Sequence, residues 1–185
     1  MTSQSDNQIM LKVRDGHLDQ LSILFERYNK TLFNFFLRLT SNRAISEDLV
    51  QEVFLRMLKY RHTYRGDGKF INWMFHISRN AHVDFFKKQN RVQQFNESET
   101  EPISPDSNPD ERLEADQEVA LLQAALTKLS LEKREVLVLS RFHNMKYEDI
   151  AQIQDCRVGT IKARVHRAIK ELRAIYFELS GESVS

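Results

Sequence analysis

At 185 residues the chain is long enough for one domain of ordinary size or for two small ones. Its net charge of +1 hides two segments of opposite charge. Residues 97–118 hold nine acids against one Arg, which suggests a solvated connector. Residues 157–173 hold six Lys or Arg against one Glu, which suggests a polyanion-binding surface. A single cysteine excludes an intramolecular disulfide, and the lack of an apolar run of roughly 18 to 20 residues excludes a membrane span, so a cytoplasmic protein is expected.

Apolar residues at helical spacing, with few Gly and Pro, predict an all-α fold that begins with two amphipathic helices. The first helix is expected from about His17 to Leu39, with Leu18 and Phe25 among its inward residues. The second is expected to start at Ser46, whose hydroxyl can cap it. Its outward side carries three neighbouring polar residues, Asp48, Gln51 and Glu52.

A loop and a helix rich in aromatic and basic residues follow. The loop from Tyr60 to Phe70 contains two of the five glycines, and the helix is expected from about Ile71 to Gln89. Aromatic rings stack on unpaired bases while cations bind phosphates, so this stretch suits a single-stranded nucleic acid. Burial in a small helical core is still the more common fate of any single ring, Trp73 included. The candidate single-strand contacts are Tyr64, Lys69, Phe70, Trp73, Arg79 and Asn80.

All three prolines lie among Glu, Ser, Asp and Asn in residues 96–112. Such a stretch can bury almost nothing, so it is predicted to be a flexible acidic linker between a helical domain at 10–95 and another at 113–180. The second domain is predicted to have about four helices, the first with Val119 inward and the next capped by Ser130.

The sequence from Tyr147 to Leu172 predicts two short helices that meet at a tight corner, which is a helix-turn-helix. Asp155 lies where the corner needs a left-handed residue, a conformation that Asp tolerates. Ile161, Val165 and Ala168 form one buried stripe of the second helix. Its opposite face is basic; such a face can simply be solvated, but the lack of balancing acids favours a helix in the DNA major groove. The candidate duplex contacts are Arg157, Thr160, Lys162, Ala163, Arg164, His166 and Arg167.

Three motifs in a fixed order give the chain a family resemblance. They are Glu47-Asp-Leu-Val-Gln-Glu-Val-Phe-Leu-Arg56, Phe70-Ile-Asn-Trp-Met-Phe-His-Ile-Ser-Arg-Asn80, and Tyr147-Glu-Asp-Ile-Ala together with Val158-Gly-Thr-Ile-Lys-Ala-Arg-Val-His-Arg-Ala168. With them the chain resembles bacterial sigma factors of the sigma-70 family, specifically the compact extracytoplasmic function (ECF) type that keeps only regions 2 and 4. The resemblance covers about Leu18 to Arg91 and about Ala120 to Arg173.

The resemblance implies roles for the candidate residues. Asp48, Gln51 and Glu52 match the positions that grip the clamp helices of the largest RNA polymerase subunit. The loop Tyr64 to Phe70 and Asn80 match the part that captures a flipped-out base of the −10 element, and the outer face of the second corner helix matches the −35 reader. Core RNA polymerase and promoter DNA are the implied partners, with an anti-sigma factor that in this family is often membrane-bound. Neither catalysis, a small-molecule substrate, a metal nor a cofactor is implied.

The sequence departs from the family pattern at four positions. Lys146 replaces the usual Ser, so the first corner helix lacks a capping hydroxyl and relies on acids at its positive end. Gln154 replaces Leu, Arg157 replaces Pro, and Ala163 replaces Ser. These changes affect the expected base preference rather than the class of protein.

Two other classes of protein compete with this interpretation. A two-domain repressor or activator would also carry a helix-turn-helix, but it would need neither the three polar residues of the second helix nor the aromatic loop. A hydrolase or metal enzyme is disfavoured, because the six His and one Cys show no paired ligand spacing. Pulldown with core polymerase would separate the three classes.

Overall fold

The structure is a computed structural model that describes residues 5–95 and 115–181. Within these residues it contains helices and turns but no strand, which confirms the all-α prediction. The predicted linker, residues 96–112, lies outside the described residues. The chain divides into two compact units, one built from the N-terminal helices and one from the C-terminal helices together with residues 37–43.

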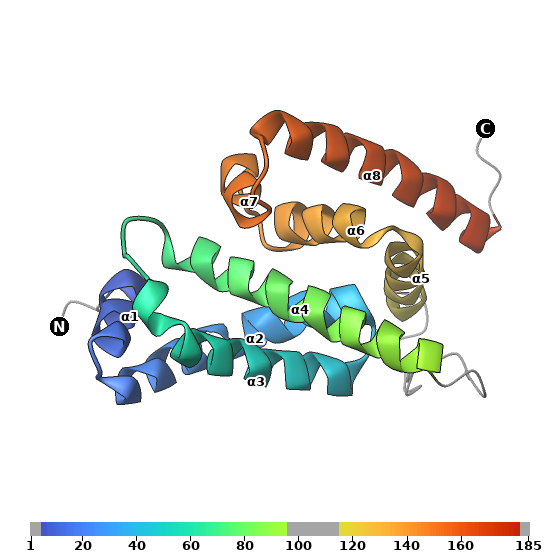
Figure 1. Ribbon diagram of the computed structural model, residues 1–185. Helices are drawn as coiled ribbons and strands as arrows, with labels where there is room; N and C mark the ends of the chain where they lie inside the picture. The colour runs from blue at the N-terminus through green and yellow to red at the C-terminus, as the bar shows by residue number, and fades with distance from the viewer. Residues whose placement is uncertain (1–4, 96–114, 182–185) are drawn as a thin grey trace. The chain divides into compact units, whose positions relative to one another are not determined.

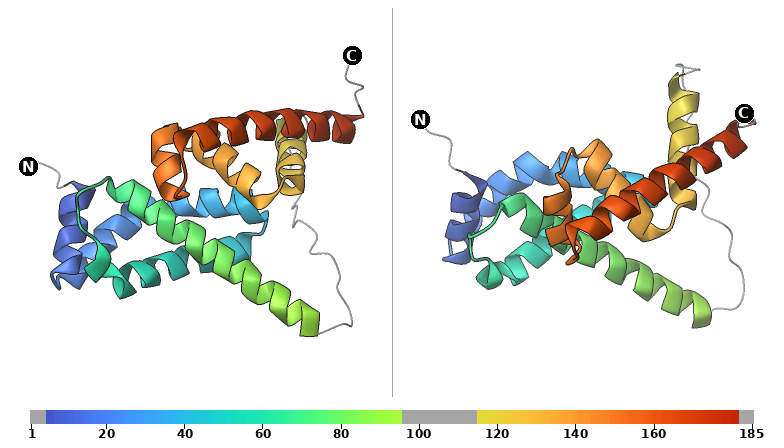
Figure 2. Two further views of the ribbon diagram at one scale, coloured as in Figure 1. Left: turned by 45° about the horizontal axis from the view of Figure 1, so that its top comes forward. Right: turned by 90° about the horizontal axis from the view of Figure 1, so that it is seen from above.

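The N-terminal unit contains the helices α1 (Asp6–Arg14), α2 (Leu21–Thr40), α3 (Arg43–Lys59) and α4 (Phe70–Phe95), except for residues 37–43 at the end of α2 and the start of α3. Figures 1 and 2 show α1 beside the loop that leads into α4. The core is largely aromatic: Phe35, Phe36 and Phe75 are fully buried, and the ring centroids of Phe35 and Phe75 lie 5.1 Å apart in an edge-to-face arrangement. Short 3-10 turns lie at Leu18–Gln20 and Arg61–Thr63.

Helix α1 is present in the structure but was not predicted from the sequence. Its first turn is closed by a capping box, in which the Ser5 hydroxyl accepts from the Gln8 N–H and the Gln8 side chain accepts from the Ser5 N–H. Ile9, Met10 and Val13 are fully buried, so one side of this short helix belongs to the core.

Helix α3 begins at Arg43, three residues before the expected start at Ser46. Ser46 therefore lies inside the helix, where it is fully buried and does not cap the first turn. A serine hydroxyl suits a helix start but is also tolerated within a helix, so the signal was ambiguous.

Two residues expected to point inward are exposed. Leu18 is 47% exposed because it lies in a 3-10 turn, outside the helical periodicity of α2. Phe25 is 43% exposed and rests against Phe54 of α3, with ring centroids 5.0 Å apart.

The C-terminal unit consists of α5 (Ala115–Lys128), α6 (Leu131–Leu137), α7 (Tyr147–Ile153) and α8 (Val158–Ser180). This agrees with the four helices expected, although α6 continues into a π-helical turn at Val138–Phe142. Ser130 occupies the N-cap position of α6, but its side chain makes no capping hydrogen bond. Val119 is exposed, not inward, because α5 packs only from its second half onward.

Candidate polymerase- and nucleic-acid-binding surfaces

The outer face of α8 presents the predicted duplex contacts. Ile161, Val165 and Ala168 are buried and fix which side of the helix faces the unit's core. The residues left outside, all exposed, are Thr160, Lys162, Ala163, His166 and Arg167. This face therefore carries two full cations and a histidine on a regular helix.

The corner that leads into α8 has the predicted geometry. Asp155 adopts a positive φ of 50°, the left-handed conformation expected at the turn. Lys146 occupies the N-cap position of α7 without a side-chain capping bond, and Glu148 and Asp149 lie in the first turn. Arg157 is the exposed N-cap residue of α8, and its side chain does not cap the first N–H groups of the helix.

Arg164 differs from the other predicted duplex contacts because its side chain is turned inward. Its guanidinium donates to Oε1 of Gln154 at 2.6 Å and pairs with Oε2 of Glu132 at 3.2 Å. The Gln154 amide in turn donates to the buried Glu135 carboxylate at 2.9 Å. Arg164 is thus partly buried and bonded within the helix-turn-helix domain, and a DNA contact by it stays a prediction.

The aromatic loop of the N-terminal unit packs inward. Tyr64 and Phe70 are 4% and 3% exposed. The rings of Tyr64 and Trp73 pack edge to face with their centroids 4.9 Å apart, and the ring centroids of Phe70 and Tyr28 are 5.3 Å apart. Little surface of Tyr64 or Phe70 is therefore available to a base, and stacking by either of them stays a prediction.

The polar residues of this region lie on the surface. Lys69 and Asn80 are exposed, while Arg79 and Trp73 are partly exposed. The Asn80 amide lies 3.2 Å from Nε2 of His76, one turn earlier on α4. An exposed amide can hydrogen-bond the edge of a base, and exposed cations can bind phosphates.

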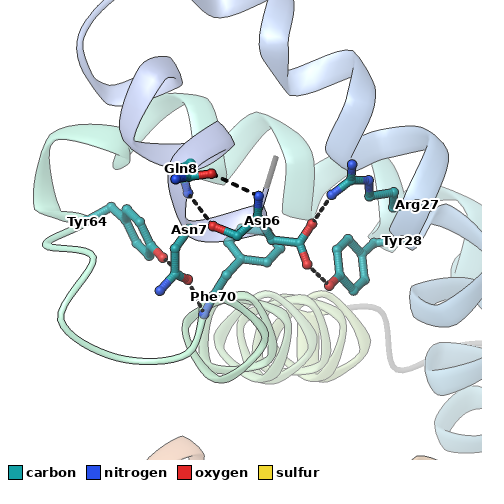
Figure 3. A network of polar contacts seen from close by, with 8 residues as sticks. Asp6, Asn7, Gln8, Arg27, Tyr28, Tyr64 and Phe70 are labelled. Atoms are coloured by element: carbon teal, nitrogen blue, oxygen red, sulfur yellow. Dashed lines mark hydrogen bonds and ion pairs between the residues drawn. The ribbon is translucent and has the colours of Figure 1, made fainter. Parts of the chain in front are cut away.

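Helix α1 holds the aromatic loop through residues that the sequence reasoning missed. Asn7 bonds to Tyr64 and Phe70, and Asp6 bonds to Arg27 and Tyr28 of α2 (Figure 3). Asn7 also donates to the Gly68 carbonyl. The capping-box pattern Ser5-Asp-Asn-Gln8, followed by apolar residues, could have revealed the helix. Nothing in the local sequence indicates the partners of Asn7.

The three polar residues of α3 lie on its surface as predicted. Asp48 and Gln51 are exposed. Glu52 is partly exposed and accepts a hydrogen bond from Nε of Arg56 at 2.6 Å, and Arg56 also reaches Asp84 of α4 at 2.8 Å. Asp48 therefore gives this face a negative charge, whereas the charge of Glu52 is neutralised by Arg56.

Two negative findings apply to residues 5–95 and 115–181. No helix in this part of the chain is long and apolar enough to cross a membrane. Neither do three or more His, Cys, Asp or Glu side chains in it gather closely enough to hold a metal ion.

Comparison with known proteins matches both units to one class. Residues 24–92 match the family described as Sigma-70 region 2, and residues 120–172 match Sigma-70, region 4. The order and spacing of the two regions agree with the two helical units. The class is that of RNA polymerase sigma factors.

The curated relatives narrow this class. The RNA polymerase sigma factor CarQ of Myxococcus xanthus is 31% identical over 94% of this chain and 98% of its own length. The ECF RNA polymerase sigma factor EcfG of Rhodopseudomonas palustris is 33% identical over 77% of each chain. The sigma factor RpoE of Bartonella quintana, solved in complex with the anti-sigma factor NepR, is 27% identical with a TM-score of 0.66 over 83% of this chain and 94% of its own. This chain belongs to the ECF sigma factors of the sigma-70 family.

Proposed function

We propose that the two units divide promoter recognition between them. The C-terminal unit (α5 to α8) reads the −35 element as duplex, and the N-terminal unit (α1 to α4) binds core polymerase and the −10 element as an opened strand. The observation that supports this division is the contrast between a regular helix with an exposed basic face and a loop whose exposed groups are an amide and cations. A repressor would need the first surface only.

Duplex binding is assigned to α8. Helix α8 is a regular helix with an exposed basic face, and the DNA major groove is wide enough to admit an α-helix. Lys162 and Arg167 supply charge for phosphates or base edges, and the N-terminus of α8 beside Arg157 attracts a phosphate through its N–H groups.

Single-strand binding is assigned to the loop from Tyr64 to Phe70 and to the exposed side of α4. Asn80 would bond the edge of an extruded base, while Lys69 and Arg79 would hold the backbone of the strand. The buried rings of Tyr64 and Phe70 would shape the pocket and leave Trp73 as the ring with exposed surface.

The remaining assignments concern partners. Asp48, Gln51 and Glu52 on α3 would dock on a basic surface of core polymerase. The solved relative in complex with NepR supports an anti-sigma factor as a further partner of this chain. The cytoplasm, where polymerase and DNA are found, is the proposed location, and phosphodiester chemistry is left to polymerase.

The decisive experiment replaces Asn80. Asn80→Ala holoenzyme should form open complexes roughly 10- to 100-fold less well on linear DNA, because a lost base contact costs about 1 to 3 kcal/mol. The template is a promoter that the parent holoenzyme selects from a randomised DNA library. Permanganate reactivity of unpaired thymines measures opening.

Asn34→Ala provides the matched control, since it removes an exposed Asn from α2. Both variants should bind core polymerase like the parent. Equal opening by Asn80→Ala and the parent would remove the base pocket from the proposal.

A further inference from the structure

The loop between residues 64 and 70 cannot hold its own shape by regular structure. Gly66 has a φ of 77°, and the loop residues Arg65, Asp67, Gly68 and Lys69 are exposed. Helix α4 begins at Phe70, directly after Lys69. A lysine side chain has no acceptor, so it cannot cap the first N–H groups of α4. Both the loop and the helix start therefore need a partner from elsewhere.

Asn7 of α1 supplies that partner with both ends of its side-chain amide. Its Oδ1 accepts from the Tyr64 hydroxyl at 2.7 Å and from the Phe70 N–H at 2.9 Å (Figure 3). Its Nδ2 donates to the Gly68 carbonyl at 2.8 Å. These three bonds connect the loop's beginning, its last glycine and the first residue of α4. Asn7 acts as the cap that Lys69 cannot provide.

The chemistry of the three partners selects an amide at position 7. A backbone N–H can only donate and a carbonyl can only accept, so Phe70 and Gly68 require an acceptor and a donor on the same side chain. Asp would keep the two accepted bonds but would face the Gly68 carbonyl with a carboxylate. Ala would lose all three bonds.

The rest of α1 fixes Asn7 in place. Asp6 pairs with Arg27 at 2.5 Å and accepts from the Tyr28 hydroxyl at 2.5 Å, which ties the first turn of α1 to α2. A Cβ at Gly66 would meet the Leu11 side chain at 3.1 Å, so α1 also lies directly against the middle of the loop.

The Tyr64 hydroxyl is a dependable donor in this arrangement. Burial, together with the carboxylates of Asp6 and Asp67, raises the pKa of Tyr64 to about 12. The phenol thus stays protonated at neutral pH and can donate to Asn7.

We propose that Asn7 is a positioning residue for single-strand binding: by bonding Tyr64, Gly68 and Phe70 it holds the loop and the start of α4 in the conformation that receives the opened promoter strand. This inference rests on the single-strand role proposed for the N-terminal unit. It assigns the N-terminal helix an effect on promoter opening that acts through Tyr64, Gly68 and Phe70.

A first experiment tests the brace without DNA, on the full-length protein. In Asn7→Ala the Phe70 amide should exchange its hydrogen at least about tenfold faster, because each lost bond contributes roughly a factor of two to ten. The only tryptophan, Trp73, lies 4.9 Å from the Tyr64 ring, so its fluorescence should shift as the loop loosens. Unchanged exchange at Phe70 would overturn the proposal.

A second experiment measures promoter opening by holoenzyme on the selected promoter. Asn7→Ala should lower opening roughly tenfold and leave core binding unchanged, and Asn7→Asp should fall between Asn7→Ala and the parent because it keeps two of three bonds. Gln8→Ala is the matched control, since it removes half of the capping box from α1 and the side-chain hydrogen bond that it removes is made with Ser5, not with the loop. If Gln8→Ala lowers opening as much, mere fraying of α1 explains the defect and the proposal falls.

The Asn80→Ala variant tells a failure of the Asn7 proposal from a failure of the proposed single-strand site. If Asn80→Ala lowers opening but Asn7→Ala does not, the base pocket stands and the positioning role of Asn7 is wrong. If neither lowers opening, the base pocket is wrong and the inference falls with it.

Discussion

The two surfaces proposed to meet DNA are built in different ways. The face of α8 is carried by a regular helix whose orientation follows from the buried stripe of Ile161, Val165 and Ala168. The loop before α4 is held by hydrogen bonds from Asn7, a residue 57 to 63 positions away in the chain. The first surface depends on local sequence, whereas the second depends on a distant helix.

This difference matches what each surface is proposed to bind. Duplex DNA presents a groove of regular width, so a preformed helix can enter it without rearrangement. A base that leaves the stack costs a few kcal/mol, and a loop that had to be ordered at the same moment would add its own entropy. Bracing the loop beforehand removes that second cost.

The largest expected effect concerns α3, a third surface built like α8. Asp48→Lys and Glu52→Lys each place a cation where a basic polymerase surface is expected, and such a mismatch costs several kcal/mol. Core association should therefore fall at least a hundredfold, measured by fluorescence anisotropy of labelled sigma titrated with core polymerase. A helical face is preformed, so neither change should disturb the fold.

Asp48→Lys is the cleaner of the two variants, because Asp48 is exposed and its side chain has no hydrogen bond or ion pair within the part of the chain that the structure describes. Glu52→Lys also breaks the pair with Arg56, which should cost about 0.3 to 0.5 kcal/mol of stability. If either variant assembles with core polymerase and initiates normally, the docking role of α3 is wrong.

The next effect tests the face of α8. Lys162→Ala and Arg167→Ala should each weaken holoenzyme binding to duplex −35 DNA by about 1 to 3 kcal/mol, while Lys128→Ala on α5 should not. A lost phosphate contact reduces the salt dependence and affects all sequences alike, and a lost base contact relaxes preference at one position. Binding isotherms at several salt concentrations on matched and mutated sites distinguish the two. Parent-like binding by both variants would overturn the groove assignment.

Much of the C-terminal surface could be predicted because its geometry is local. The spacing of Ile161, Val165 and Ala168 fixes the outer face of α8, and the need for a left-handed residue at the corner was met by Asp155. Arg164 was placed with the outer residues, although it lies three positions after Ile161 and four before Ala168, at the border of the buried stripe. That spacing was a usable signal.

The N-terminal surface could be predicted only in outline. The aromatic and basic composition indicated a loop and helix of interest, but composition does not tell a buried ring from an exposed one, and Tyr64 and Phe70 are buried. The part played by Asn7 could not be found at all, because hydrogen bonds across about 60 residues leave no periodic trace in the sequence.

The smallest expected effect tests whether the helix-turn-helix is oriented by apolar packing alone. Gln154 links the buried Glu135 carboxylate to Arg164. Gln154→Leu would take a hydrogen-bond donor from Glu135 and an acceptor from Arg164, which should cost about 1 to 3 kcal/mol of stability. The buried leucine side chain would offset part of this cost. The free energy of unfolding in urea should therefore fall by about 1 kcal/mol. Combining Gln154→Leu with Glu135→Gln removes the buried charge that needs the donor, so the double variant should lose less stability than the two single losses added together. Strict additivity would mean that Gln154 and Glu135 are not coupled, and the bonded chain from Glu135 to Arg164 would then not help to orient α8.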